Sequence, residues 1–284
     1  MRRRYWCDRI ARIAMVMSVT GLISSLGALI AVVLAKGWQA LDWTMLVRLP
    51  SGSYYLTGEE GGILNAIVGS SLLAIGATLL ALPLALPVAL LLQPDYAGRT
   101  RVAGALRILL DSLWGVPSIV YGACGFALMV ALGWRASLLA GIVTLAGVIL
   151  PLMVRAMDEV LRAVPKPMKE AAYALGLTRW ETMRFVVIRQ ALPALVTVVL
   201  LAFGRAIGDA ASVLFTAGYT DNLPRSLFDP VASLPLAVFF LLNSPFPEVQ
   251  RQAYAAATVL LVSVLVISGS ARLLAHRLSR FVVR

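Results

Sequence analysis

Apolar runs of roughly 20 residues recur along this chain, and they restrict its fold more than any other feature. A helix of that length crosses the hydrocarbon core of a bilayer, where every backbone polar group must be hydrogen-bonded within the protein. The runs cover approximately residues 13–35, 63–92, 105–132, 136–154, 191–217 and 253–274. They predict an all-α polytopic membrane protein with six transmembrane helices.

The composition agrees with this fold class and excludes several functions. The 284 residues are 60% hydrophobic and only 14% charged, whereas about a quarter of the residues of a soluble protein are charged. The net charge of +11 comes mainly from basic residues between the apolar runs, which form no continuous basic face, so we expect no nucleic-acid partner. Cys7, Cys124 and the single histidine His276 are too few and too scattered for a disulfide framework or a zinc site.

The distribution of basic residues predicts the topology. Arginine and lysine are concentrated in both tails and in the connections 93–104 and 155–190, which by the positive-inside rule are cytoplasmic. We expect a single domain that consists of a cytoplasmic tail, a six-helix core containing a cytoplasmic coupling segment, and a second cytoplasmic tail. These parts are residues 1–12, 13–274, 155–190 and 275–284, respectively.

The segment 169–181 is a polar island in this apolar chain. Good helix formers precede Gly176, which suits a left-handed helix cap because glycine has no Cβ. Thr178 and Glu181 have the spacing of a capping box, which predicts that a second helix starts at once. Ala171 and Ala172 would give the first helix a shallow face that fits a partner's groove. The alternative is an ordinary amphipathic loop helix.

Arg205 and Asp209 lie inside the fifth apolar run, where charged residues are costly and commonly functional. Their spacing of four places them on one helix face, so they are expected to form an ion pair. In the functional interpretation, Arg205 faces the transport pathway and Asp209 orients it. A guanidinium group suits a tetrahedral oxyanion because its planar fork donates two hydrogen bonds. The alternative is a purely structural pair.

The third apolar run contains Gly115, Pro117 and Ser118, a sequence that favours a broken or sharply bent helix. If a second half begins at Ser118, its free N–H groups would favour an anion at membrane depth. A simple proline kink is the alternative. Asp111, in the same run, is placed near the cytoplasmic interface and receives no substrate role.

Glu170-Ala171-Ala172, Gly176 and the later Leu192-Pro193 resemble the EAA loop of type I ATP-binding-cassette (ABC) importer permeases, which have the MetI-like fold. In that family the loop is the coupling helix that fits a cleft of the ATPase. The segments 115–122 and 205–217 narrow the resemblance to the PstA-type permeases of phosphate importers, as do Glu59-Glu60 before the second run. Asp209 departs from the pattern, because the family usually has glutamate there.

This resemblance implies a pore-forming subunit of a phosphate importer in the bacterial inner membrane. The implied partners are a PstC-type permease, a PstB-type ATPase dimer and a PstS-type phosphate-binding protein. The chain has no Walker sequence, so ATP and magnesium would be bound by the ATPase and the chain itself would need no cofactor. The alternatives are a permease for sulfate or molybdate, an ATP-independent secondary transporter or channel, and a membrane scaffold or sensor.

Overall fold

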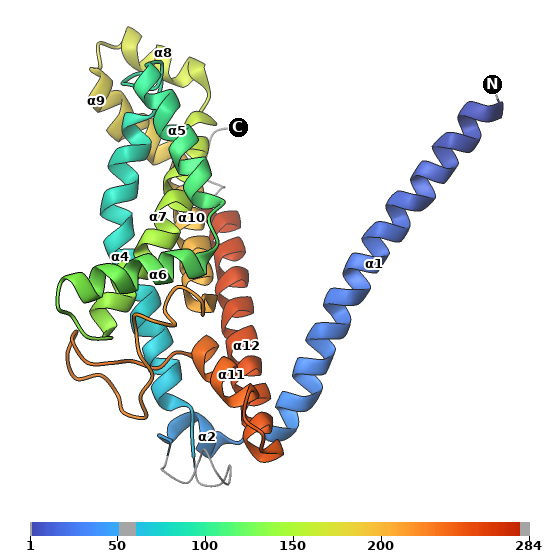
Figure 1. The fold of residues 1–284 in the computed structure, drawn as a ribbon. Coiled ribbons are helices and arrows are strands. Elements are labelled where there is room, and N and C mark those ends of the chain that lie inside the picture. The colour runs from blue at the N-terminus through green and yellow to red at the C-terminus, as the bar shows by residue number, and fades with distance from the viewer. Residues whose placement is uncertain (1, 51–60, 279–284) are drawn as a thin grey trace.

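The computed structural model describes residues 2–50 and 61–278, and these ranges fold into helices and connections without a strand. Within them, five helices or helix runs are long and apolar enough to cross a membrane, and a bent pair is a sixth candidate (Figure 1). The long helices are α1 (Arg2–Ala40), α4 (Leu64–Leu91), α7 (Leu138–Arg162), α10 (Ile188–Gly208) and α12 (Pro247–Leu278). The bent pair is α5 (Arg101–Trp114) and α6 (Ser118–Ala131).

The centre of the bundle is the contact between α4 and α7, the most extensive helix pair of the described chain. One face of α4 carries alanines that are completely buried: Ala74, Ala77, Ala81, Ala85 and Ala89. Small side chains let membrane helices approach closely, where dispersion contacts replace the hydrophobic effect as the source of stability. Larger residues of α7, such as Ile149 and Met153, fill the space opposite.

A short helix, α11 (Leu234–Leu242), lies in the connection between α10 and α12. Its N-terminus is capped by Ser233, whose hydroxyl accepts a hydrogen bond from the Leu236 N–H. The Leu234 N–H donates to the Ser70 hydroxyl of α4 over 2.7 Å, which fixes α11 to the bundle.

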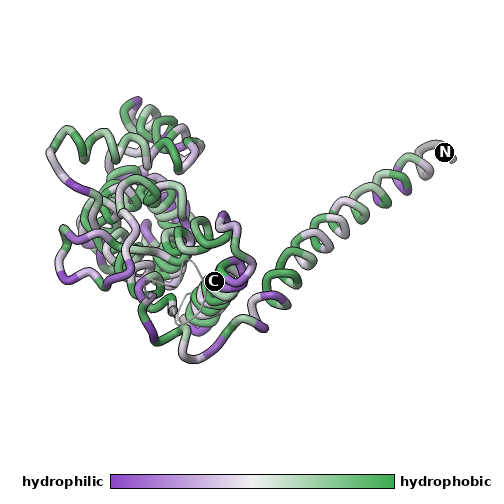
Figure 2. The backbone as a smooth tube through the Cα atoms, turned by 60° about the horizontal axis from the view of Figure 1, so that its bottom comes forward, coloured by the Kyte–Doolittle hydropathy of each residue, from purple (hydrophilic) through white to green (hydrophobic). Residues whose placement is uncertain are grey.

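Helix α1 stands apart from the bundle over most of its length (Figure 1). Its exposed side chains are predominantly apolar, and Figure 2 shows hydrophobic residues along it between hydrophilic ends. Contact with the other helices is made near its C-terminus, where α1 packs against α12. Residues 13–35 of the predicted six-helix core are therefore accessible to lipid or to another subunit.

The ends of two helices differ from the ends of the predicted apolar runs. Helix α7 continues through Arg162, so the polar segment 155–190 begins inside a helix, whose charged side chains form ion pairs. The fifth span ends at Gly208 instead of near residue 217, because the backbone of Asp209 is extended and the chain then forms turns. Glu59, Glu60 and residues 279–284 lie outside the described residues.

Candidate coupling and substrate sites

The polar island forms the predicted helical hairpin at one end of the bundle (Figure 1). Its first helix, α8 (Lys166–Ala174), ends at Gly176, which has a φ of 85°. The N–H of Gly176 donates to the Tyr173 carbonyl, and that of Leu177 donates to the Ala172 carbonyl, over 2.9 and 3.1 Å. This is the hydrogen-bond pattern of a Schellman motif. The predicted left-handed cap is confirmed.

The second helix of the hairpin, α9 (Arg179–Glu181), starts with the predicted capping box. The Thr178 hydroxyl accepts a hydrogen bond from the Glu181 N–H, and the Glu181 carboxylate accepts one from the Thr178 N–H over 2.8 Å. A π-helical segment, η1 (Thr182–Val187), then leads directly into α10. The hairpin is therefore continuous with a membrane-spanning helix, through which it can transmit movement.

The exposed surface of the hairpin differs from the predicted one at Ala172, which was expected to lie on the accessible face. Glu170, Ala171 and Gly176 are exposed, whereas Ala172 is only 5% exposed and packs inside the chain. Leu175 is 82% exposed, and Trp180 is also exposed, although both are large and apolar. The sequence interpretation did not assign these two residues to the surface. A carboxylate beside exposed apolar side chains suits contact with another protein.

Substitution of Gly176 by alanine should destabilise the hairpin by about 1 kcal/mol, because an L-residue with a side chain is strained at positive φ. No atom lies within 4 Å of the position that the alanine Cβ would occupy, so backbone conformation alone would cause the loss. The matched control is Gly104→Ala in α5, where the Cβ would also meet no atom and alanine favours the helix. Thermal unfolding in detergent should show a lower midpoint for the first variant only.

The hairpin is attached to the connection after α4 by polar contacts. The Lys169 ammonium lies 3.0 Å from the Asp95 carboxylate, and the Arg179 guanidinium donates to the Asp95 carbonyl over 3.3 Å. Partial burial raises the pKa of the Tyr173 hydroxyl, and the neighbouring Asp95 carboxylate raises it further. Beside these contacts, a cavity of about 500 Å³ lies between the connection and α8, and Glu170 forms part of its wall.

Behind the hairpin, a buried carboxylate links helices α5 and α7 to the connection after α4, and the sequence interpretation missed it. Asp158 of α7 is 1% exposed and accepts hydrogen bonds from Gln93, Arg107 and Arg162 over 2.9, 3.2 and 3.0 Å. Arg155 adds a longer ion pair of 3.7 Å and also pairs with Asp111. We call Asp158 and these four partners the Asp158 cluster. The i,i+4 spacing of Asp158 and Arg162 was the available sequence signal.

The predicted break in the third apolar run is confirmed. Helices α5 and α6 meet at an angle of 99°, with Pro117 as the N-cap residue of α6 and Ser118 as its first residue. The Tyr121 hydroxyl donates across the break to the Leu113 carbonyl over 2.9 Å. The backbone of Gly122 lies against the turn after α10, since a Cβ there would come within 2.7 Å of the Ala211 carbonyl oxygen. The start of α6 is thus held against the end of α10.

Arg205 and Asp209 are brought near this break, but the predicted ion pair between them is wrong. Within the described residues, no ion pair joins the two side chains. Asp209 has left the helix, so the i,i+4 geometry is lost, and its carboxylate accepts a hydrogen bond from the Ser212 N–H over 3.0 Å. Arg205 is exposed and lies within electrostatic range of Tyr121. Its guanidinium is therefore accessible.

A bundle of apolar helices with a broken span and a capped hairpin at one end has the architecture of a multi-pass α-helical membrane protein. Solved structures share this fold. A chain of the inward-facing MetNI methionine ABC transporter matches 76% of this chain and 95% of its own length, with a TM-score of 0.63 and 16% identity. An amino acid ABC transporter crystallised with histidines matches with a TM-score of 0.59 and 18% identity, over 76% of this chain and 93% of its own.

Sequence comparison defines the family more narrowly. Residues 81–280 match the family described as binding-protein-dependent transport system inner membrane component. The phosphate transport system permease protein PstA of Yersinia pestis is 30% identical over 96% of this chain and 92% of its own. PstA of Xylella fastidiosa (strain Temecula1 / ATCC 700964) is 33% identical over 86% of this chain and 84% of its own. The chain belongs to this family of inner-membrane transport components and, within it, to the PstA permeases.

Proposed function

We propose that this chain is the permease subunit of an ATP-driven importer of inorganic phosphate. The observation that carries the proposal is the similarity to phosphate transport permeases over nearly the whole chain. The accessible Arg205 guanidinium beside the broken span supports an oxyanion substrate, because it can donate a pair of charge-assisted hydrogen bonds. Ser118 at the start of α6 would contribute free backbone N–H groups, and Asp209 would shape the turn beside them.

The hairpin end of the bundle would face the cytoplasm in this proposal. The cationic residues of the Asp158 cluster lie at that end, as do Lys169 and Arg179, and positive charge favours the cytoplasmic side. Helix α1 begins and α12 ends toward the same side (Figure 1), which would make both termini cytoplasmic. The single domain of residues 1–284 would then span the membrane with the hairpin as its coupling element.

The assembly would contain a PstC-type permease, a PstB-type ATPase dimer and a PstS-type binding protein. ATP and magnesium would be bound by the ATPase, and this chain would carry out no bond chemistry. Closure of the ATPase would push on Glu170, Ala171 and Gly176, with Ala172 packing α8 to the chain behind it. The exposed length of α1 supports the presence of another membrane subunit.

The test is uptake of radiolabelled phosphate by proteoliposomes that contain the full complex. Phosphate should accumulate only when ATP is supplied on the side of the membrane that carries the ATPase. Excess sulfate or molybdate should not compete with phosphate for uptake. Efficient competition by either ion would favour the other-oxyanion alternative. ATP-independent uptake by the purified chain would favour a secondary transporter or channel. Absence of any uptake in an assembled complex with active ATPase would favour a scaffold or sensor.

Glu170→Arg should uncouple the proposed importer, because it reverses the charge of an exposed hairpin residue. We expect uptake to fall about tenfold or more, since like-charge contacts at an interface cost several kcal/mol. The matched control is Glu159→Arg, another exposed carboxylate at the end of α7. Uptake and binding of the ATPase subunit should be measured together. Retention of both by Glu170→Arg would show that this residue does not belong to the coupling contact.

A further inference from the structure

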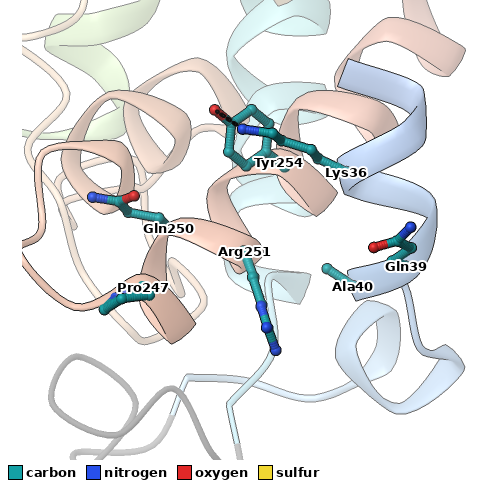
Figure 3. Close-up of a pocket in the computed structure, with 7 residues that line it drawn as sticks. All are labelled: Lys36, Gln39, Ala40, Pro247, Gln250, Arg251 and Tyr254. Atoms are coloured by element: carbon teal, nitrogen blue, oxygen red, sulfur yellow. Dashed lines mark hydrogen bonds between the residues drawn. The ribbon is translucent and has the colours of Figure 1, made fainter. Parts of the chain in front are cut away.

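A pocket of about 450 Å³ lies between the C-terminal end of α1 and the N-terminal end of α12. It is at the end of the molecule opposite the α8–α9 hairpin (Figure 1). Figure 3 shows that α1 contributes Lys36 and Gln39 to its wall and that α12 contributes Gln250, Arg251 and Tyr254. None of these residues belongs to the coupling or substrate sites described above.

The pocket is built by a close crossing of the two helices at Gly37. A Cβ at Gly37 would lie 1.9 Å from the Thr258 hydroxyl oxygen and 2.5 Å from the Tyr254 carbonyl oxygen, so only glycine permits this approach. The Thr258 hydroxyl donates to the Val33 carbonyl over 3.1 Å, which holds α12 against α1 one turn before Gly37. Lys36 and Tyr254 are consequently held beside each other at a defined position.

The described residues that line the pocket contribute two cations and two amides but no carboxylate. The Lys36 ammonium lies 3.4 Å from the Tyr254 hydroxyl and 4.7 Å from the centre of its ring (Figure 3). Arg251 pairs with Glu248 outside the pocket wall over 3.2 Å, but both side chains are largely exposed and such pairs are weak. The pocket therefore offers positive charge and several hydrogen-bond donors to an anion.

The position of the pocket along α1 corresponds to the surface of the membrane. The apolar run of α1 ends at Ala35, and Lys36 is the first cation after it. Trp38 and Trp43 follow with exposures of 76% and 74%. Exposed tryptophans are enriched at the headgroup level of membrane proteins. An anion in the pocket would thus lie where the phosphate groups of phospholipids lie.

We propose that the pocket between α1 and α12 binds a phosphate group at the membrane surface. An anionic phospholipid headgroup and free inorganic phosphate are the two sources of this chemistry. A lipid headgroup in the pocket would stabilise the contact between α1 and α12 at the point where the two helices separate. Inorganic phosphate would instead be bound at the membrane surface on the side opposite the hairpin. The proposal rests on the pocket alone and does not require that the chain transports phosphate.

The test uses the full-length chain, purified in detergent with the subunits that copurify with it. Native mass spectrometry would count bound phosphatidylglycerol, with diacylglycerol of the same acyl chains as the phosphate-free probe. Equilibrium dialysis with radiolabelled phosphate would measure the free ion. The variants are Lys36→Gln and Arg251→Gln, and the matched control is Arg225→Gln, which removes an exposed cation outside this pocket.

Each pocket variant should weaken binding about fivefold, as expected for one cation near an anionic surface. Lys36→Arg retains the charge and should restore binding, which separates loss of the site from loss of the fold. A selective loss of phosphatidylglycerol would identify a lipid site, and a selective loss of inorganic phosphate would identify an ion site. The proposal would be overturned if the pocket variants bound phosphatidylglycerol as well as wild type does and also bound inorganic phosphate as well as wild type does. An equal loss in Arg225→Gln, or equal binding of diacylglycerol, would also overturn it.

Discussion

Arg205→Lys is expected to reduce phosphate uptake by the assembled transporter strongly while ATP hydrolysis continues. Lysine keeps the positive charge but replaces the planar fork by a compact ammonium group. Loss of a pair of charge-assisted hydrogen bonds to the substrate corresponds to about 1.5–3 kcal/mol, or about 10- to 100-fold in uptake. Arg205 is accessible and has no ion-pair partner within the described residues, so the substitution should disturb little else.

The matched control is Arg189→Lys, which changes an exposed arginine at the other end of α10. Uptake in proteoliposomes should be compared at equal ATPase activity. A second variant, Arg205→Ala, separates an importer from a scaffold, because a scaffold should keep its function without the guanidinium. If Arg205→Lys transports phosphate as well as wild type, Arg205 supplies only charge or structure. The N-terminus of α6 at Ser118 would then be the next candidate for the substrate site.

Asp158→Asn should reduce the free energy of unfolding by about 2–3 kcal/mol. The carboxylate is almost fully buried and is the shared acceptor of the Asp158 cluster. Asparagine has nearly the same shape but no charge, so Arg107 and Arg162 would lose their buried anion. Removing one partner of a buried ion pair costs more, about 3–5 kcal/mol, but these arginines are partly exposed and water would offset some of that cost.

The control for this prediction is Asp111→Asn. Asp111 pairs with Arg155 of the same cluster, but its side chain is half exposed, so its loss should cost less than about 1 kcal/mol. Thermal unfolding in detergent with a fixed lipid content would measure both variants. Equal shifts of the two midpoints would show that Asp158 is not the centre of the cluster. Reduced uptake by Asp158→Asn at a temperature where it stays folded would indicate that the cluster also transmits movement from the hairpin.

Local features of the sequence predicted the hairpin and the broken span. Gly176 and the Thr178–Glu181 pair determine a cap and a helix start through contacts within a few residues, and both are confirmed. Pro117 likewise predicts where α5 must end and α6 begin. Such signals can be read from the chain because the groups that satisfy them lie within one or two helical turns.

The predicted ion pair between Arg205 and Asp209 is wrong because the prediction assumed that the helix continues through Asp209. Gly208 is the last residue of α10, and Asp209 instead accepts a hydrogen bond from a turn that packs against α6. The Asp158 cluster was missed for a related reason. Gln93 reaches Asp158 from the connection after α4 and Arg107 reaches it from α5, and no spacing in the sequence brings them together.

By itself, the sequence determined a helical membrane protein, the approximate positions of its spans and the capped hairpin between two of them. These follow from hydrophobic length and short-range hydrogen bonding, which depend on neighbouring residues. Only the tertiary structure decided where α10 ends, which carboxylate is buried among arginines, and that α1 and α12 enclose a cationic pocket. Each of these depends on which side chains of distant segments meet, and helix packing fixes that choice in three dimensions.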